Sequence, residues 1–253
     1  MIKKILKTLL IILFWGLVWQ ALSMIVGLEL LLPSPISTLK MLFELACTLE
    51  FYEIILRSLV RILIGTAAAV ILGVTLAVVS ARFKLLHDFI SPIMTVIKAV
   101  PVASFIVLLL LWTGRNILPS IISALIVLPI VWSNVEMGIL ETDKSLIELA
   151  RVYKMSGWKK IRHIYLPSTL PYFISSLNSS LGLAWKAGIA AEVLALPLIA
   201  IGKQIYESKL YLETVDLFAW TLTVIIISLI IEKLVVFAIK KATSSKTKMG
   251  GSV

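Results

Sequence analysis

The chain has 253 residues, of which 60% are hydrophobic and 15% are charged, and its mean hydropathy is +1.04. Soluble domains are typically about half apolar and about a quarter charged, so this composition excludes an ordinary soluble protein and indicates a helical protein that crosses a membrane several times. The net charge of +10 does not indicate nucleic-acid binding, because the basic residues stand at the ends of apolar runs and form no aromatic-interleaved patch.

The N-terminal region, residues 1–27, predicts a first membrane span. It opens with three lysines and continues as an apolar run that is longer than the roughly 7–15 residues of a signal-peptide core. Ala21–Ser23 resembles a cleavage site, so a processed signal peptide is the alternative, but we favour an uncleaved span. Residues 28–61 are expected to form an extracytoplasmic segment, in which Pro33–Pro35 breaks the helix and Leu39–Leu49 forms a short amphipathic piece.

The second span is predicted from Ile62 to Ala81, a run of 20 uncharged residues that has the length needed to cross the hydrocarbon core. Small residues recur along this run at every fourth position: Gly65, Ala69, Gly73, Ala77 and Ala81. Such a stripe lets two helix backbones approach closely in lipid, so we interpret it as a packing seam. Arg57 and Arg61, just before the span, are expected to extend to its outer edge.

Four further apolar runs predict the remaining spans: Phe89–Gly114, Ile117–Val135, Ser168–Leu198 and Leu217–Ile239. Pro101 interrupts the first of these runs and Pro129 kinks the second. The third carries another stripe of small residues that ends at Glu192. Residues 62–239 therefore form a six-span core together with the first span, and residues 240–253 are expected to be a basic, disordered tail.

The distribution of Lys and Arg predicts the orientation in the membrane. The segments on the N-terminal side of the bilayer, namely 1–7, 82–84, 141–167 and 240–253, hold more than twice as many Lys and Arg residues as the segments on the other side. By the positive-inside rule both termini and the loop at 141–167 lie in the cytoplasm.

The loop at 141–167 is the only long polar interval in the core, and it is predicted to contain a short helix. Apolar or small residues recur there at spacings of three or four: Leu146, Leu149, Ala150, Tyr153 and Gly157. Asp143 or Ser145 is expected to cap the start of the helix. An amphipathic helix of this kind lies on the lipid surface, packs on its own bundle or docks into a partner, and the pattern leaves these three uses open.

This loop resembles the EAA loop of bacterial ATP-binding-cassette (ABC) importer permeases. The family pattern is Glu-Ala-Ala, three residues, Gly, nine or so residues and then Ile-x-Leu-Pro, and the positions that match it are Glu148, Ala150, Ile164 and Leu166–Pro167. Two positions depart from the pattern, because Leu149 replaces the first Ala and Lys154 stands where the family has Gly. Gly157 follows three residues later, so the departure concerns the turn after the helix.

The resemblance extends over most of the chain to the nitrate, sulfonate and taurine branch of these permeases, some members of which handle thiamine precursors. The matching segments are Leu32–Pro35, Ser58–Arg61, Pro101, Leu111–Gly114, Trp185 and Ala191–Glu192. It implies an all-α, MetI-like fold in the bacterial plasma (inner) membrane, working as a homodimer with two ATPase subunits and an extracytoplasmic solute-binding protein. In that family the EAA helix fits a cleft on the ATPase and carries its motion into the spans.

The resemblance assigns ATPase coupling to Glu148, Leu149, Ala150, Tyr153, Gly157, Trp158 and Pro167. The chain has no G-x-x-x-x-G-K-[ST] loop, so ATP is expected to bind to the partner subunit and the chain itself is expected to need no cofactor. The outer segments at 33–53 and 201–216 are expected to meet the binding protein, and their acidic residues suit a basic partner.

The candidates for a translocation path are Lys98, Pro101, Lys186 and Glu192. A charge at the bilayer centre costs at least about 2.5–3.5 kcal/mol, so such residues usually face a bundle interior or a wet path. Lys186 and Glu192 are about 240° apart around one helix, so each needs another partner. A structural alternative is that Glu192 pairs with one of the lysines, and Glu136 and Asn134 are either gate or packing residues.

The predicted function is that of a permease for a small organic or anionic solute, and the sequence does not identify the solute. Lys98 and Lys186 favour an anion, whereas Trp112, Trp132 and Trp185 equally suit a flat heterocycle. A rival is an ion-coupled secondary transporter acting alone, which predicts an inverted repeat that the two halves of the chain do not display. An enzyme is not expected, since no metal-ligand spacing or nucleophile motif is present.

Overall fold

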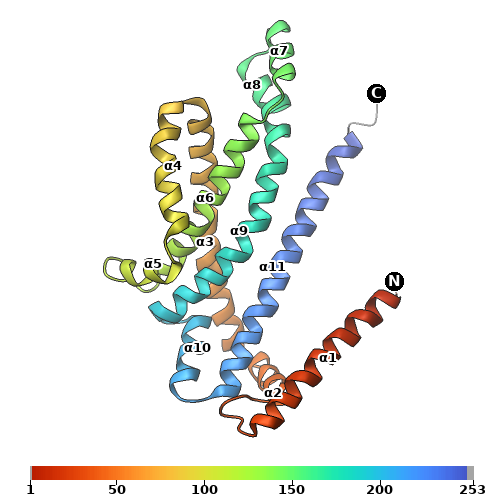
Figure 1. The fold of residues 1–253 in the computed structure, drawn as a ribbon, viewed down its shortest axis with the longest axis vertical. Coiled ribbons are helices and arrows are strands. Elements are labelled where there is room, and N and C mark those ends of the chain that lie inside the picture. The colour runs from red at the N-terminus through yellow and green to blue at the C-terminus, as the bar shows by residue number, and fades with distance from the viewer. Residues whose placement is uncertain (1, 250–253) are drawn as a thin grey trace. The chain divides into compact units, whose positions relative to one another are not determined.

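The computed structural model describes the backbone of residues 2–249 and the side chains of residues 6–235 and 237. Every regular element in this part of the chain is a helix, which confirms the all-α prediction (Figure 1). The elements are α1 (Ile2–Val26), α2 (Pro35–Ala46), α3 (Leu49–Arg82), α4 (Lys84–Ala99), α5 (Val102–Leu109), α6 (Leu118–Leu140), α7 (Lys144–Val152), α8 (Gly157–Lys160), the π-helix η1 (Ile161–Tyr165), α9 (Leu166–Ala195), α10 (Ile201–Leu210) and α11 (Thr214–Met249).

The chain divides into two compact units. Unit 1 comprises Met1–Ser58 and Leu196–Ile227, and unit 2 comprises Leu59–Ala195 and Ser228–Val253. Each unit is therefore built from two separate stretches of sequence, and the long helices α3 and α11 each contribute to both.

In unit 1, the segment between α1 and α2 folds back on α1 and also reaches the start of α11. The Ser23 hydroxyl donates to the Leu32 carbonyl at 2.9 Å, and the Thr214 hydroxyl donates to the Leu30 carbonyl at 2.6 Å. α2 starts at Pro35, earlier than the expected Leu39, because the Ser34 hydroxyl caps it and Pro is well suited to the first helical position. The predicted extracytoplasmic segment is thus largely helical.

Among the described residues, four helices are long and apolar enough to cross a membrane, and the bent pair α4–α5 makes a fifth if it counts as one broken span. Six spans were expected. The remaining predicted span, Ser168–Leu198, corresponds to α9, which is about 45 Å long at 1.5 Å per residue. α9 does not satisfy the same test of length and composition, since Ser, Asn, Lys and Glu side chains make it more polar.

The predicted span over Phe89–Gly114 is interrupted, as expected, at Pro101. α4 and α5 meet at a bend of 100°, and turns follow α5. The break lies at Val100, whose ψ of 131° is extended, because the following Pro101 disfavours helical geometry at the preceding residue. Pro92, by contrast, is accommodated within α4.

The stripe of small residues on α3 is a packing seam, as predicted. A Cβ added to Gly65 would lie 1.9 Å from the carbonyl oxygen of Ser120 on α6, and one added to Gly73 would lie 3.1 Å from Val131. Ala69 and Ala77 are completely buried. The backbones of α3 and α6 therefore approach as closely as side chains of this size allow.

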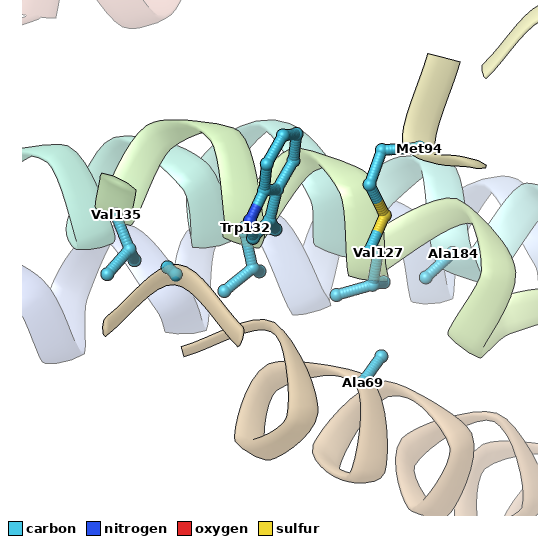
Figure 2. Close-up of a cluster of buried hydrophobic side chains, with 8 residues drawn as sticks. Ala69, Met94, Val127, Trp132, Val135 and Ala184 are labelled. Carbon is cyan, nitrogen blue, oxygen red and sulfur yellow. The ribbon is translucent and has the colours of Figure 1, made fainter. Parts of the chain in front are cut away.

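The core of unit 2 lies around α6. Its buried cluster consists of Ala69 and Ala77 from α3, Met94 from α4, Val127, Val131, Trp132 and Val135 from α6, and Ala184 from α9. Figure 2 shows Ala69 pointing from α3 towards α6, with the ring of Trp132 between Val135 and Val127 along α6. The core thus joins four helices through one central helix.

The C-terminal tail differs from its prediction. Residues 240–249 continue α11 as helix, because no Gly or Pro interrupts the sequence between Thr214 and Met249. The remaining residues of the expected disordered tail, 250–253, lie outside the described residues.

Candidate functional site

The loop at 141–167 forms a compact helical projection at one end of α6 and α9. α7 and α8 lie beyond the last turn of α6 and the first turn of α9, whereas α5 packs at the opposite end of the same two helices (Figure 1). The predicted short helix of the loop is α7. Its position means that any force on α7 acts at the ends of both α6 and α9.

Asp143 caps the start of α7. Its Oδ1 accepts hydrogen bonds from the Ser145 backbone N–H at 2.8 Å and from the Ser145 hydroxyl at 2.6 Å. These two donors hold the pKa of Asp143 below its usual value because they stabilise the carboxylate. Of the two residues expected to cap this helix, Asp143 is the N-cap, and Ser145 supplies donors to it.

The end of α7 explains the departure from the family pattern at Lys154. This residue has a left-handed φ of +48°, a backbone conformation that residues other than glycine rarely adopt. The Lys154 N–H donates to the Arg151 carbonyl at 3.0 Å, and the Met155 N–H donates to the Ala150 carbonyl at 2.9 Å. These two bonds make a Schellman turn, which usually has Gly at this position. The turn therefore forms with Lys despite the missing Gly.

The predicted apolar face of α7 is divided between the interior and the surface. Ala150 is 1% exposed and packs inward. Five large apolar side chains of the projection point outward: Leu146 (42% exposed), Leu149 (53%), Val152 (77%), Tyr153 (73%) and Trp158 (70%). We call these five residues the coupling patch. Exposed apolar groups gathered within a polar loop are typical of a contact surface.

The other predicted coupling residues lie around this patch. Glu148 is exposed, and no ion pair of the described residues includes it. Gly157 is also exposed, with open space where a Cβ would stand, so its role does not depend on close packing inside this chain.

Pro167 lies in a helix and not in a turn. α8, η1 and α9 follow one another without a break, and the Leu166 N–H donates to the Ile161 carbonyl five residues earlier. A proline ring would clash with the carbonyl four residues before it in a regular α-helix, and the wider π-turn accommodates this ring. The Ile-x-Leu-Pro element therefore joins the loop to α9 through an uninterrupted helix.

Glu192 forms a buried ion pair with Arg61. Its carboxylate accepts from the Arg61 guanidinium, with the Glu192 side chain fully buried and the Arg61 side chain 13% exposed. The structural alternative for Glu192 named a lysine as its partner, whereas the partner is Arg61, which was expected to extend to the outer edge of its span. A buried carboxylate needs a close cation, and the packing of α3 on α9 brings Arg61 to it.

The two lysines of the predicted path lie in different surroundings. The Lys98 ammonium is exposed and donates to the Ser133 hydroxyl on α6 at 3.4 Å. Lys186 lines a cavity of about 210 Å³ between α9 and α11, together with Asn178, Ser179 and Glu232. Pro101, the fourth predicted path residue, is the exposed N-cap of α5.

A polar network that the sequence did not reveal joins α3, α4 and α6. The His87 Nδ1 lies 2.9 Å from Glu136 Oε1, and the His87 ring stacks on Trp132, whose indole N–H donates to the Ser80 hydroxyl at 3.0 Å. Glu136 is 5% exposed and was left open as a gate or packing residue. The partners are 49 residues apart in sequence, so only the fold brings them together. Asn134 donates within its own helix, to Ile130.

The described part of the chain thus combines apolar helices with the length of membrane spans and an amphipathic helix, α7, on a polar loop. Residues 69–248 match the family of binding-protein-dependent transport system inner membrane components, and the chain belongs to that family. It is thus an ABC importer permease component, as the resemblance of its loop implied.

Its relatives include permeases for inorganic and organic anions. The chain is 31% identical over 193 residues to the nitrate import permease protein NrtB of Synechococcus elongatus, covering 70% of this chain and 67% of the relative. It is 26% identical over 204 residues to the putative aliphatic sulfonates transport permease protein SsuC of Bacillus subtilis, covering 80% and 74%.

Among solved structures, the fold is similar to a chain of the MetNI methionine ABC transporter in an inward-facing conformation. The TM-score is 0.55 at 20% sequence identity, and the match covers 77% of this chain and 93% of the other. This similarity confirms the MetI-like fold.

Proposed function

We propose that the chain is the permease subunit of an importer whose separate ATPase moves it through α7. The observation that carries this proposal is the coupling patch, whose five exposed apolar side chains stand on a polar loop at the end of α6 and α9. A cleft on the ATPase would bury these side chains, and Glu148 at the rim would pair with a cationic group of that partner.

The surroundings of α7 suit the transmission of a rigid movement. At the α6 side, the Thr142 hydroxyl is buried and donates to the Gly138 carbonyl at 3.2 Å. A Cβ at Gly138 would lie 2.9 Å from the ring of Tyr172, so α6 and α9 are in close contact near the loop. At the α9 side, the helix continues from α8 through η1 without a break. A displacement of α7 would therefore move α6 and α9 together.

ATP chemistry belongs to the partner in this proposal, since the sequence contains no phosphate-binding glycine loop. ATP binding would close two ATPase subunits and turn two copies of the permease outward, and hydrolysis would return them to the inward-facing state. In this proposal two copies of the chain form a homodimer in the inner membrane, and the Lys and Arg distribution favours an orientation with both termini in the cytoplasm.

The transported solute is proposed to be a small anion or a small organic anion. Relatives named for nitrate and for sulfonates support this class, and so do the lysines within the membrane part, Lys98 and Lys186. Lys186 lines a cavity together with the amide of Asn178 and the hydroxyl of Ser179, and the Glu232 carboxylate of the same cavity offsets part of its positive charge.

An extracytoplasmic binding protein is proposed to deliver the solute to unit 1. A surface cavity of about 430 Å³ there gathers four carboxylates from distant parts of the chain: Glu29, Glu44, Glu213 and Asp216. One lysine, Lys40, also lines it. The excess of negative charge suits a basic rim on the partner.

The proposal is tested by disrupting the coupling patch in cells that also express the ATPase and binding-protein genes of the same system. Tyr153→Glu would place a charge at the buried centre of the contact and is expected to lower ATPase co-purification and solute uptake at least tenfold. Phe83→Glu is the matched control, because Phe83 is an exposed aromatic residue on the turn between α3 and α4, outside the patch. Normal co-purification and uptake of Tyr153→Glu would reject the coupling role and favour a transporter that acts alone.

A further inference from the structure

Unit 2 contains a groove near the coupling loop that the transport cycle described above does not use. It has a volume of about 510 Å³ and lies between α3, α6 and the η1–α9 junction. Its lining is mostly apolar, with Val74 and Val78 on α3 and Val135 and Ile139 on α6. Three residues with polar groups, Arg82, Tyr165 and Thr169, also line it. The volume is within the range of about 300–1,000 Å³ that is usual for ligand sites.

The lining residues change from apolar to charged along α3. Val74, Val78 and Arg82 are spaced by four residues, so they share one face of the helix and follow one another at intervals of about 6 Å. Arg82 is in the last turn of α3, and Val74 lies two turns deeper in the span. Val135 and Ile139 repeat the same spacing on α6, which also runs towards the coupling loop. The groove therefore runs along the helices and has its cation at the end near the loop.

Arg82 is an exposed cation, and none of the ion pairs among the described residues includes it. Tyr165 is half-buried at the same end of the groove, and tyrosine is enriched at the boundary between hydrocarbon and water. A ligand that matches this arrangement has a long apolar part and an anionic head. Phospholipids of a membrane surface have that chemistry, and basic pockets between spans on the cytoplasmic side bind anionic headgroups.

We propose that this groove binds one acyl chain of an anionic phospholipid, with the lipid phosphate on Arg82. The acyl chain lies along Val78 and Val74 towards the middle of the bilayer. The assignment to the cytoplasmic leaflet rests on the orientation given under the proposed function, whereas lipid binding at Arg82 does not depend on it. Because Tyr165 belongs to η1, which connects the coupling loop to α9, a bound lipid would also stabilise the contact between α3 and that junction.

The test is lipid retention by the purified full-length permease, measured by native mass spectrometry after incubation with phosphatidylglycerol or phosphatidylcholine. The wild-type protein is expected to retain phosphatidylglycerol at least fivefold better than phosphatidylcholine. Arg82→Gln is expected to abolish this preference. Lys84→Gln is the matched control, since it removes an exposed cation two residues away that does not line the groove, and it is expected to keep the preference.

A second variant tests the apolar part of the site. Val78→Trp would fill the groove and is expected to lower retention of both lipids. Equal losses of the phosphatidylglycerol preference in Arg82→Gln and Lys84→Gln would mean that the lipid responds to net surface charge only, which would overturn the proposal. An unchanged preference in Arg82→Gln would overturn it too. So would unchanged lipid retention in a folded Val78→Trp protein. ATPase co-purification, measured in parallel, shows separately whether the coupling role holds.

Discussion

The left-handed backbone of Lys154 explains why the family pattern of this loop has glycine at this position. The turn after α7 requires a left-handed residue, and Lys154 adopts φ +48° there. The position could be aligned from sequence, because the spacing from Glu148 matches the family pattern. Whether the turn would form without Gly was not predictable, since that depends on the two hydrogen bonds to Arg151 and Ala150.

Replacing this residue by glycine is expected to stabilise the protein. A left-handed conformation costs about 1–2 kcal/mol for a residue with a Cβ, and Lys154→Gly removes that cost, although glycine also raises the entropy of the unfolded chain. The expected net gain is up to about 1 kcal/mol, observed as a higher Tm of the purified protein. Lys154→Ala keeps the Cβ and serves as the control. A lower Tm for Lys154→Gly would contradict the role of the turn.

The Arg61–Glu192 pair is a second feature at the residue scale. Breaking a buried pair by removing one partner typically costs about 3–5 kcal/mol, so Glu192→Leu is expected to lower the Tm strongly. The double variant Arg61→Met with Glu192→Leu is expected to recover most of that loss, because no buried charge remains alone. Uptake by the double variant separates the two roles of Glu192. Normal uptake would mean a structural pair, and loss of uptake from a stable double variant would mean that the pair acts in the path.

At the scale of elements, the seam between α3 and α6 was predictable and the bend between α4 and α5 was only partly so. Small residues at every fourth position predict close packing whatever the partner helix is, and Gly65 and Gly73 do pack on α6. Pro101 signals an interruption in its helix, but the bend of 100° depends on how α5 packs against α6 and α9, which no local pattern contains.

The seam makes a direct prediction for Gly65. A Cβ at this position would lie 1.9 Å from a backbone oxygen that no side-chain rotation can move, so Gly65→Leu is expected to separate α3 from α6. Overpacking typically costs about 1–3 kcal/mol, and a clash with backbone is expected at or above that range. Ala68→Leu is the control, because Ala68 is exposed on the same helix. Equal yields and equal Tm values for the two variants would contradict the seam.

The packing of helices against one another also explains why the partner of Glu192 was not predicted. The spacing of six residues between Lys186 and Glu192 on α9 excluded a direct pair between them. Which other cation lies next to Glu192 depends on how α9 packs against α3. The contact between His87 and Glu136 was missed for the same reason, since the two residues lie on different helices and no local signal links them.

At the scale of the whole molecule, the sequence was sufficient for the class of protein and for the position of the projecting loop. Composition and the loop motif led to the permease family, which the family match over residues 69–248 confirms. The six expected spans correspond to α1, α3, the α4–α5 pair, α6, α9 and α11, although α9 is too polar to qualify on composition alone. Three polar side chains of α9, Ser176, Ser180 and Glu192, are buried against other helices, which sequence hydropathy does not take into account.

We propose that the coupling patch is the surface by which a separate ATPase moves the permease. The most direct measurement is photocrosslinking in intact membranes, with a photoreactive amino acid in place of Leu149 and, in a separate protein, in place of Phe83. We expect a crosslink to the ATPase subunit from position 149 and none from position 83, with a yield at 149 that changes when ATP is bound. No ATPase crosslink from position 149, in a protein that still imports its solute, would contradict the coupling role of the patch.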